Sequence, residues 1–186
     1  MATEIEKKYR LTAKERAGLA ERLRAVGALC EGREFEENVL YAGGQLDSRR
    51  QVLRVRRVGD AAIFTYKERY ESESTIKHHR EDETRVEDAG ALHEILEALG
   101  YRPALVYEKR RTTWRVRRAE VMLDELPFGL FVEIEGEEND IREVERLLNL
   151  ENTEAETATY PELTERHGQR RGEMIEARFQ MTLPDA

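Results

Sequence analysis

The 186-residue chain contains little cysteine and no long apolar run. Its single cysteine, Cys30, excludes an intrachain disulfide framework and a cysteine-rich metal site. No apolar run approaches the roughly 20 residues that a membrane-spanning helix needs, and the charged N-terminal segment does not resemble a signal peptide. We therefore expect a cytoplasmic protein that makes no membrane contact.

Positive charge is outnumbered by negative charge. Lys and Arg together number 31 against 39 Asp and Glu, which gives a formal net charge of −8. Binding to nucleic acids in general requires a dominant basic field, so this balance argues against a nucleic-acid partner. The basic residues are concentrated in particular segments, such as 54–57 and 109–111, and this favours a local site for a small anion.

Charge of both signs is abundant, since charged residues make up 38% of the chain and hydrophobic residues 39%. A chain of this length is expected to form one domain with a real core. This much charge therefore requires either an unusually solvated surface or a polar interior. We predict one domain over residues 1–168 and a C-terminal tail over residues 169–186. Arg170 and Arg171 are expected on a frayed segment, and the alternative is that they cover one end of the site.

The first predicted strand, residues 4–8, places Glu4, Glu6 and Lys8 on one face. Two carboxylates at this spacing can share a hard divalent cation such as Mg²⁺ or Mn²⁺, and the neighbouring ammonium suits a phosphate oxygen. A solvated strand face would show the same alternation, so its recurrence decides between the two interpretations. The alternation recurs on six further predicted strands, at Arg54 and Arg56, at Lys67, at Glu81, Glu83 and Arg85, at Lys109 and Arg111, at Asp124, and at Glu133 and Glu135.

Most links between the predicted strands are short, which indicates antiparallel hairpins. Three helices are expected, beginning near residues 12, 88 and 140, and the second is expected to bury a stripe formed by Leu92, Ile95, Leu96 and Leu99. The helices do not alternate one-for-one with the strands. We therefore predict an α+β fold, an eight-stranded antiparallel β-barrel, closed or nearly closed, with helices packed outside and the charged faces lining a tunnel. The polar residues 71–75 are expected to form a loop with room to move over a site.

Five motifs follow one another along the chain: Glu-x-Glu-x-Lys at 4–8, Leu-Arg-Val-Arg at 53–56, Thr-Tyr-Lys at 65–67, Lys-Arg-Arg at 109–111, and Leu-Asp-Glu-Leu-Pro-Phe-Gly-Leu-Phe-Val-Glu-Ile-Glu at 123–135. This ordered set resembles the CYTH superfamily, the triphosphate tunnel metalloenzymes, over about residues 2–165. Within it the chain looks closest to the CyaB-like cyclase group. The superfamily includes class IV adenylate cyclases, thiamine triphosphatases and inorganic triphosphatases.

The resemblance implies a role for each charged position. Metal ligands for Mg²⁺ or Mn²⁺ would be Glu4, Glu6, Asp124, Glu133 and Glu135. The triphosphate would be bound by Lys8, Arg54, Arg56, Lys67, Lys109 and Arg111. The sorting agrees with chemistry, because carboxylates suit hard cations and guanidinium groups suit bidentate contact with phosphate. The catalytic candidates are Lys8, Glu81 and Glu83, although Arg85 stands where a further acidic residue is usual, so both glutamates could instead pair with neighbouring bases.

The activity that follows from the resemblance is metal-dependent hydrolysis of a phosphoanhydride bond in inorganic, nucleoside or thiamine triphosphate. A class IV adenylate cyclase, which converts ATP to cyclic AMP and pyrophosphate, would use the same charged cradle and stays an alternative. A non-catalytic polyphosphate- or nucleotide-binding module is a second alternative. Both a monomer and a homodimer are open.

The two adjacent histidines, His78 and His79, are interpreted as surface residues. Neighbouring strand residues point to opposite faces, so together they make a poor metal pair.

Overall fold

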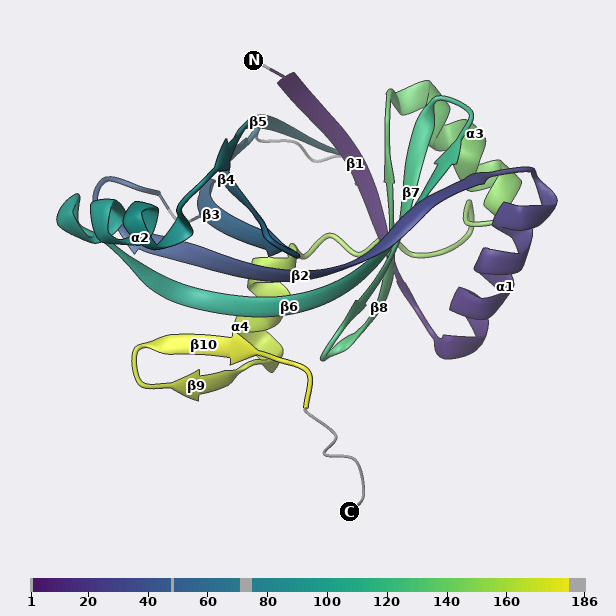
Figure 1. Ribbon diagram of the computed structural model, residues 1–186. Coiled ribbons are helices and arrows are strands. Elements are labelled where there is room, and N and C mark those ends of the chain that lie inside the picture. The colour runs from purple at the N-terminus through teal and green to yellow at the C-terminus, as the bar shows by residue number, and fades with distance from the viewer. Residues whose placement is uncertain (1, 48, 71–74, 181–186) are drawn as a thin grey trace.

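The computed structural model describes residues 2–47, 49–70 and 75–180, and its eight longest strands close into an antiparallel barrel (Figure 1). These strands are β1 (Ala2–Leu11), β2 (Leu29–Gly43), β3 (Gln51–Val58), β4 (Ala61–Arg69), β5 (Lys77–Val86), β6 (Tyr101–Val116), β7 (Ala119–Leu126) and β8 (Gly129–Glu135). Their order is β2-β3-β4-β5-β1-β8-β7-β6, and β6 pairs back with β2. The prediction of a closed eight-stranded tunnel is confirmed.

The barrel closes through its two longest strands. The β2–β6 ladder runs from Leu29 opposite Arg115 to Gly43 opposite Tyr101, with register shifts near Cys30 and Leu40. Irregularities of this kind bend a strand and increase its local twist. Figure 1 shows both strands curving together along the length of the barrel.

Two helices pack on the outer face of the barrel, α1 (Ala13–Ala25) and α3 (Glu138–Leu148) (Figure 1). α1 is capped by Thr12, which forms a capping box with Glu15. The apolar faces of both helices join the outward side chains of β1, β6, β7 and β8 in the largest core cluster, which includes Leu19, Leu23, Ile141, Val144, Leu148, Val132 and Ile134. Because the apolar sides of these strands point outward to the helices, their charged sides point inward.

The second predicted helix, α2 (Ala89–Ala98), covers less of the barrel than expected. Leu96 is buried in a cluster with Tyr41, Leu53 and Val55. Ile95 and Leu99 are 56% and 64% exposed, so the prediction that the whole stripe is buried is wrong. The reason is the position of α2, which lies at one end of the barrel wall and contacts mainly β6 (Figure 1).

The C-terminal part contains three elements that the sequence pattern did not reveal: α4 (Tyr160–His167), β9 (Gln169–Arg171) and β10 (Met174–Ala177). β10 pairs in parallel with β6, at Leu105, Val106 and Tyr107, and β9 pairs with β10. Ala177 is buried with Leu105 and Leu163 in a second apolar cluster. The expectation of a frayed segment from residue 169 is therefore wrong for residues 169–177.

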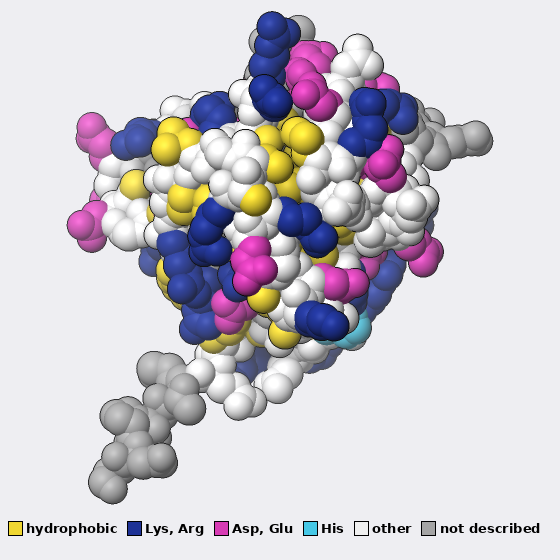
Figure 2. Space-filling view, turned by 90° about the vertical axis from the view of Figure 1, so that its right-hand side faces the viewer, with side chains coloured by type: hydrophobic (Ala, Val, Ile, Leu, Met, Phe, Trp, Pro, Cys, Tyr) yellow, Lys and Arg dark blue, Asp and Glu magenta, His cyan; other side chains and the backbone are white. Residues whose placement is uncertain are grey.

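The predicted loop at 71–75 falls almost entirely outside the described residues. Among the helices that are described, none is long and apolar enough to cross a membrane. On the face that carries α1 and α3, Figure 2 shows basic and acidic side chains interspersed, without an extended field of one sign.

Candidate active site

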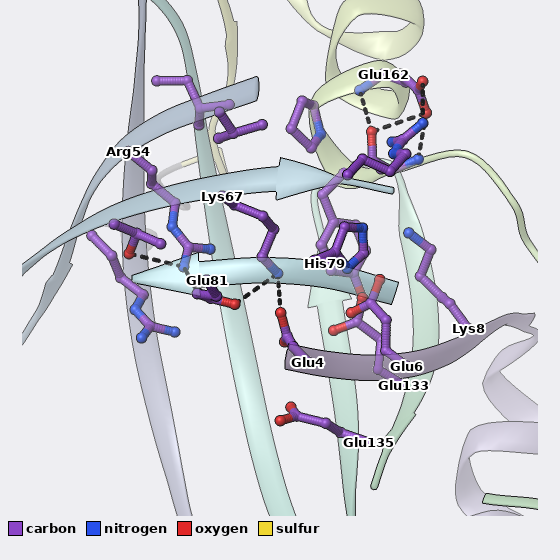
Figure 3. Close-up of a pocket in the computed structure, with 18 of the residues that line it drawn as sticks. Glu4, Glu6, Lys8, Arg54, Lys67, His79, Glu81, Glu133, Glu135 and Glu162 are labelled. Atoms are coloured by element: carbon purple, nitrogen blue, oxygen red, sulfur yellow. Dashed lines mark hydrogen bonds and ion pairs between the residues drawn. The ribbon is translucent and has the colours of Figure 1, made fainter. Parts of the chain in front are cut away.

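A cavity of about 750 Å³ occupies the interior of the barrel (Figure 3). Twelve of the thirteen predicted site residues line it: Glu4, Glu6, Lys8, Arg54, Arg56, Lys67, Glu81, Glu83, Lys109, Arg111, Glu133 and Glu135. The exception is Asp124. Among the described residues that line the cavity are nine Lys and Arg and nine Glu, so the interior has mixed sign and almost no net charge.

Strands β3, β4 and β5 form a wall in which Arg54, Arg56 and Lys67 already have carboxylate partners. Arg54 lies 3.4 Å from Glu81 and 3.3 Å from Glu83, and Arg56 lies 3.1 Å from Glu83. The Thr65 hydroxyl donates a hydrogen bond of 2.7 Å to Glu83, which fixes that carboxylate. These pairs hold both guanidinium groups facing the tunnel. Glu81 and Glu83 thus both pair with neighbouring bases in this structure.

Lys67, on the same wall, bridges two strands. Its ammonium forms ion pairs with Glu4 of β1 and, at 3.0 Å, with Glu81 of β5 (Figure 3). Burial by itself lowers the pKa of Lys67, but Glu6, Glu4 and Glu81 together raise it well above its usual value. Lys67 is therefore a permanent cation at the centre of the cavity.

The opposite wall, on β6, β7 and β8, is organised around Arg111. Its Nε and Nη2 atoms donate to the two oxygens of Asp124 at 2.8 and 2.6 Å, and Nη2 also donates to Glu133 at 2.6 Å. Asp124 is completely buried and accepts a further hydrogen bond of 2.7 Å from the Tyr160 hydroxyl. Burial raises the pKa of Asp124, but Arg111 and Lys109 outweigh it and hold the pKa far below its usual value. Asp124 therefore acts in this structure as the counter-ion of Arg111.

Glu36 on β2 belongs to the same network, although the sequence pattern did not single it out. It is 1% exposed and lies 3.3 Å from Lys109 and 3.8 Å from Arg111, and Asn38 donates a hydrogen bond of 3.3 Å to it. Burial raises the pKa of Glu36, but the positive charges of Lys109 and Arg111 outweigh burial and lower the pKa to about 2. Glu34, Glu36 and Asn38 have the same strand parity, so alternation along the N-terminal half of β2 could have revealed it.

The floor of the cavity brings carboxylates close together. Burial raises the pKa of Glu6, but Lys67, Lys77 and Lys8 lower it to about 2. The pKa of Glu133 is raised, first by burial and then by the negative charge of Glu6. Figure 3 shows Glu6 and Glu133 next to each other, with Glu4 and Glu135 nearby. Like charges at such a place favour a cation between them.

These carboxylates fit a hard divalent cation in their chemistry, since all of them are oxygen donors. In the part of the chain that the structure describes, no three acidic or histidine side chains are gathered closely enough to hold a metal as they stand. The pKa of Glu135 is raised by burial and by Glu120, and no described cation pairs with it. Glu135 is thus the donor with least to lose from binding a metal, whereas Glu133 would have to share its contact with Arg111 and Glu6 its ion pair with Lys77. Glu4 would have to exchange its contact with Lys67.

His79 is a second residue that the sequence analysis placed incorrectly. It is 2% exposed, lines the cavity, and has no hydrogen-bond partner at Nδ1, so its interpretation as a surface residue is wrong. Burial lowers the pKa of His79 to about 4, with Lys67 contributing. His78 points to the other side, where it lies 3.3 Å from Glu138. His79 has the same strand parity as Glu81, and this parity could have predicted that His79 faces the cavity.

Residues 2–165 match the CYTH domain. The chain belongs to the CYTH family. A curated relative from Methanocaldococcus jannaschii, named "Putative adenylate cyclase", is 26% identical over 148 residues, which cover 78% of this chain and 83% of that protein.

Solved structures support the same CYTH fold. A Pyrococcus horikoshii protein has a TM-score of 0.75 at 27% identity, covering 86% of this chain and 98% of its own. A Hippeastrum protein, described as a "Putative adenylyl cyclase" with a dominant triphosphatase activity, has a TM-score of 0.64 at 18% identity, covering 86% and 93%. At that identity the second likeness concerns the fold alone.

The CYTH tunnel of this chain is bounded at one end by α4. Tyr160 places its ring 4.2 Å from Lys8 Nζ, and its hydroxyl donates to Asp124, so α4 contacts both β1 and β7. Leu40, Val52 and Pro161 also line this end of the cavity. A second cavity of about 360 Å³ shares Arg56, Arg111, Glu120 and Glu135 with the first, so the two cavities are adjacent.

Proposed function

We propose that this protein is a metal-dependent triphosphatase that hydrolyses a phosphoanhydride bond of inorganic or nucleoside triphosphate. The observation that carries the proposal is the closed tunnel, in which cations from four different strands face one cavity. Arg54 and Arg56 come from β3, Lys67 from β4, Arg111 from β6 and Lys8 from β1. Enclosing so many charged groups costs free energy of desolvation, and a bound polyphosphate with its cation would offset that cost.

The cations suit a polyphosphate chain. A guanidinium group can bind phosphate oxygens in a bidentate manner, and buried cations stabilise the charge that develops on the leaving phosphate during transfer. Arg54 and Arg56 are held facing the tunnel by Glu81 and Glu83. We assign these two glutamates a positioning role, in which they orient the arginines and exchange partners when the substrate binds.

The carboxylates supply the second requirement. Glu4, Glu6, Glu133 and Glu135 would hold Mg²⁺ or Mn²⁺, which would offset the charge of the substrate and polarise a phosphoryl oxygen. The near-neutral interior supports this division, because a triphosphate without a cation would enter a cavity that already holds as many glutamates as basic residues. Asp124, bonded to Arg111 and shielded from the cavity, is assigned to Arg111 and not to the metal.

A class IV adenylate cyclase is the second candidate, in which the ribose 3′-hydroxyl attacks the α-phosphorus and pyrophosphate leaves. The apolar residues Leu40, Val52 and Pro161 favour it, since they offer a surface for a base at the α4 end of the tunnel. The relative from M. jannaschii carries the corresponding name. Hydrolysis demands less positioning of the substrate than cyclisation does, and this keeps the hydrolase first.

The deciding experiment incubates the protein with tripolyphosphate, ATP and thiamine triphosphate, each with Mg²⁺ and with Mn²⁺, and separates cyclic AMP, pyrophosphate and orthophosphate. Orthophosphate is the expected product. Cyclic AMP with pyrophosphate from ATP would establish the cyclase in its place. Tight binding of all three compounds without any product would indicate a binding module and refute both enzymatic proposals. The Arg111→Met variant serves as the control for a contaminating phosphatase.

A further inference from the structure

The ladder that closes the barrel brings two carboxylates face to face on its outer side. Glu37 of β2 is directly opposite Glu108 of β6 in the strand register. Each has the parity opposite to that of its neighbours Glu36 and Lys109, which line the two cavities. Like charges that lie directly opposite each other destabilise a pair of strands. The β2–β6 ladder therefore contains a repulsion at this position.

Arg178, which directly follows β10, lies between these two carboxylates. Its Nη1 atom is 2.6 Å from Glu37 and 3.1 Å from Glu108. Its Nε atom lies 3.4 Å from Glu176 of β10. A guanidinium group offers five donors in one plane, so a single arginine can contact several carboxylates at once. Arg178 thus replaces a repulsion between β2 and β6 by an attraction to both strands.

Phe179 makes a second set of contacts on the same outer face. Its backbone N–H donates a hydrogen bond of 2.7 Å to the Glu108 oxygen that Arg178 leaves free. The guanidinium of Arg110 on β6 lies 4.0 Å from the centre of the Phe179 ring, which is within cation–π distance. The ring of Phe35 on β2, opposite Arg110 in the register, lies 6.5 Å from that of Phe179. Both residues that follow β10 therefore contact both strands of the ladder.

The strand before these two residues fixes their position. β10 pairs in parallel with residues 105–107 of β6, so the chain leaves β10 close to Glu108. Ala177, the residue before Arg178, is 5% exposed and belongs to an apolar cluster. A single surface ion pair contributes little to stability, but several charges in one network on an anchored backbone can contribute more.

We propose that residues 176–179 form a C-terminal clasp that holds the β2–β6 ladder closed from outside, and that local opening of the tunnel begins where this clasp is released. Glu36 and Lys109 form a buried ion pair of 3.3 Å on the inner face of the same two strands. Separation of the strands at the clasp would also separate this pair. The C-terminal segment therefore helps to hold the tunnel wall together.

The test is hydrogen exchange of the full chain, measured by mass spectrometry on peptides from β2, β6, β1 and β8. Arg178→Ala leaves the two carboxylates facing each other without a shared cation. Amides of residues 34–38 and 107–111 should then exchange about fivefold faster or more, as for the loss of one or two ion pairs from a local opening equilibrium. The β1–β8 ladder should stay within about twofold of wild type.

Arg171→Ala is the matched control. Arg171 is an exposed arginine of the same C-terminal hairpin, and it contacts Glu176 at 3.6 Å. Its replacement should leave exchange in both ladders within about twofold of wild type. Arg178→Lys keeps a positive charge near the two carboxylates and should recover part of the protection. It also carries the test, with a smaller acceleration confined to the β2–β6 ladder, if Arg178→Ala does not fold.

A double-mutant cycle tests the repulsion itself. Glu37→Gln removes one of the facing charges, so adding Arg178→Ala in that background should accelerate exchange less than Arg178→Ala does alone. An equal acceleration in both backgrounds would refute the repulsion that the clasp offsets.

The clasp is also refuted if Arg178→Ala exchanges like wild type in the β2–β6 ladder. A rise of equal size in all ladders would refute it as well, because Arg178 would then contribute only to the stability of the whole fold. None of these results depends on which reaction the tunnel carries out.

Discussion

Replacing Asp124 by Asn tests whether this carboxylate is the counter-ion of Arg111 or a metal ligand. The carboxylate is completely buried. Both of its oxygens accept hydrogen bonds from Arg111, and one also accepts from the Tyr160 hydroxyl. Lys109 lies 3.6 Å away. Neutralising the carboxylate leaves two buried cations with fewer partners. We therefore expect Asp124→Asn to destabilise the metal-free protein.

The size of the effect follows from what remains after the change. Breaking a buried ion pair by removing one partner costs about 3–5 kcal/mol. Arg111 keeps its 2.6 Å contact with Glu133, and Lys109 keeps Glu36 at 3.3 Å. The lower end of the range, about 3 kcal/mol, is therefore expected. For a chain of this length that corresponds to a fall in Tm of roughly 6–12 °C.

The assay is urea unfolding and thermal unfolding in EDTA, with Glu135→Gln as the matched control. Glu135 also lines the tunnel, but its pKa is raised by burial and by Glu120, so its ionised form destabilises the fold above that pKa and its neutralisation should leave stability equal or higher. If Asp124→Asn behaves like Glu135→Gln, with no loss of stability without metal, the counter-ion assignment is wrong and the carboxylate belongs with the metal ligands.

Three further predictions concern single residues of the tunnel. Glu6→Gln should lower turnover of tripolyphosphate by about 100-fold or more at saturating Mg²⁺, and near-normal turnover would remove Glu6 from the metal site. Arg54→Ala should raise KM for tripolyphosphate by about tenfold while the midpoint of the Mg²⁺ dependence stays unchanged, and a shifted midpoint would contradict the separation of phosphate and metal residues. Because the pKa of Glu36 is lowered to about 2, its ionised form stabilises the fold above pH 4.5 and this contribution is lost as the pH falls toward 2. Wild type should therefore lose up to about 3 kcal/mol more than Glu36→Gln over that interval in urea unfolding, and parallel curves would refute this.

The closed barrel could be predicted from the sequence because strand parity and burial are linked. Apolar residues on one face of each strand matched apolar helices, so the opposite, charged faces had to meet inside. The same argument placed twelve of thirteen site residues on the cavity. It did not require any knowledge of which strands pair.

Parity could not show how the charges pair with one another inside the tunnel. Asp124 has the correct parity for the lumen, but Arg111 and Tyr160 cover it, and these contacts depend on the register of β6 with β7 and on the position of α4. α4 itself was missed because its apolar residues form only a short stripe. His79 was misplaced because it was considered as a pair with His78 and not with Glu81 on its own face.

The closure of the barrel through β2 and β6 also sets the order in which the chain can fold. Partners in this ladder are 58 residues apart at Gly43 and Tyr101 and 86 residues apart at Leu29 and Arg115, and β1 forms its ladders with β5 and β8. During synthesis the first strand has no neighbour until β5 emerges, and β2 keeps an open edge until β6 follows. Such distant pairings form slowly and leave strand edges free to pair with other chains. A nascent chain that stops before β6 is therefore an open sheet prone to aggregation, and the cations of β3 and β6 share a cavity only after that closure.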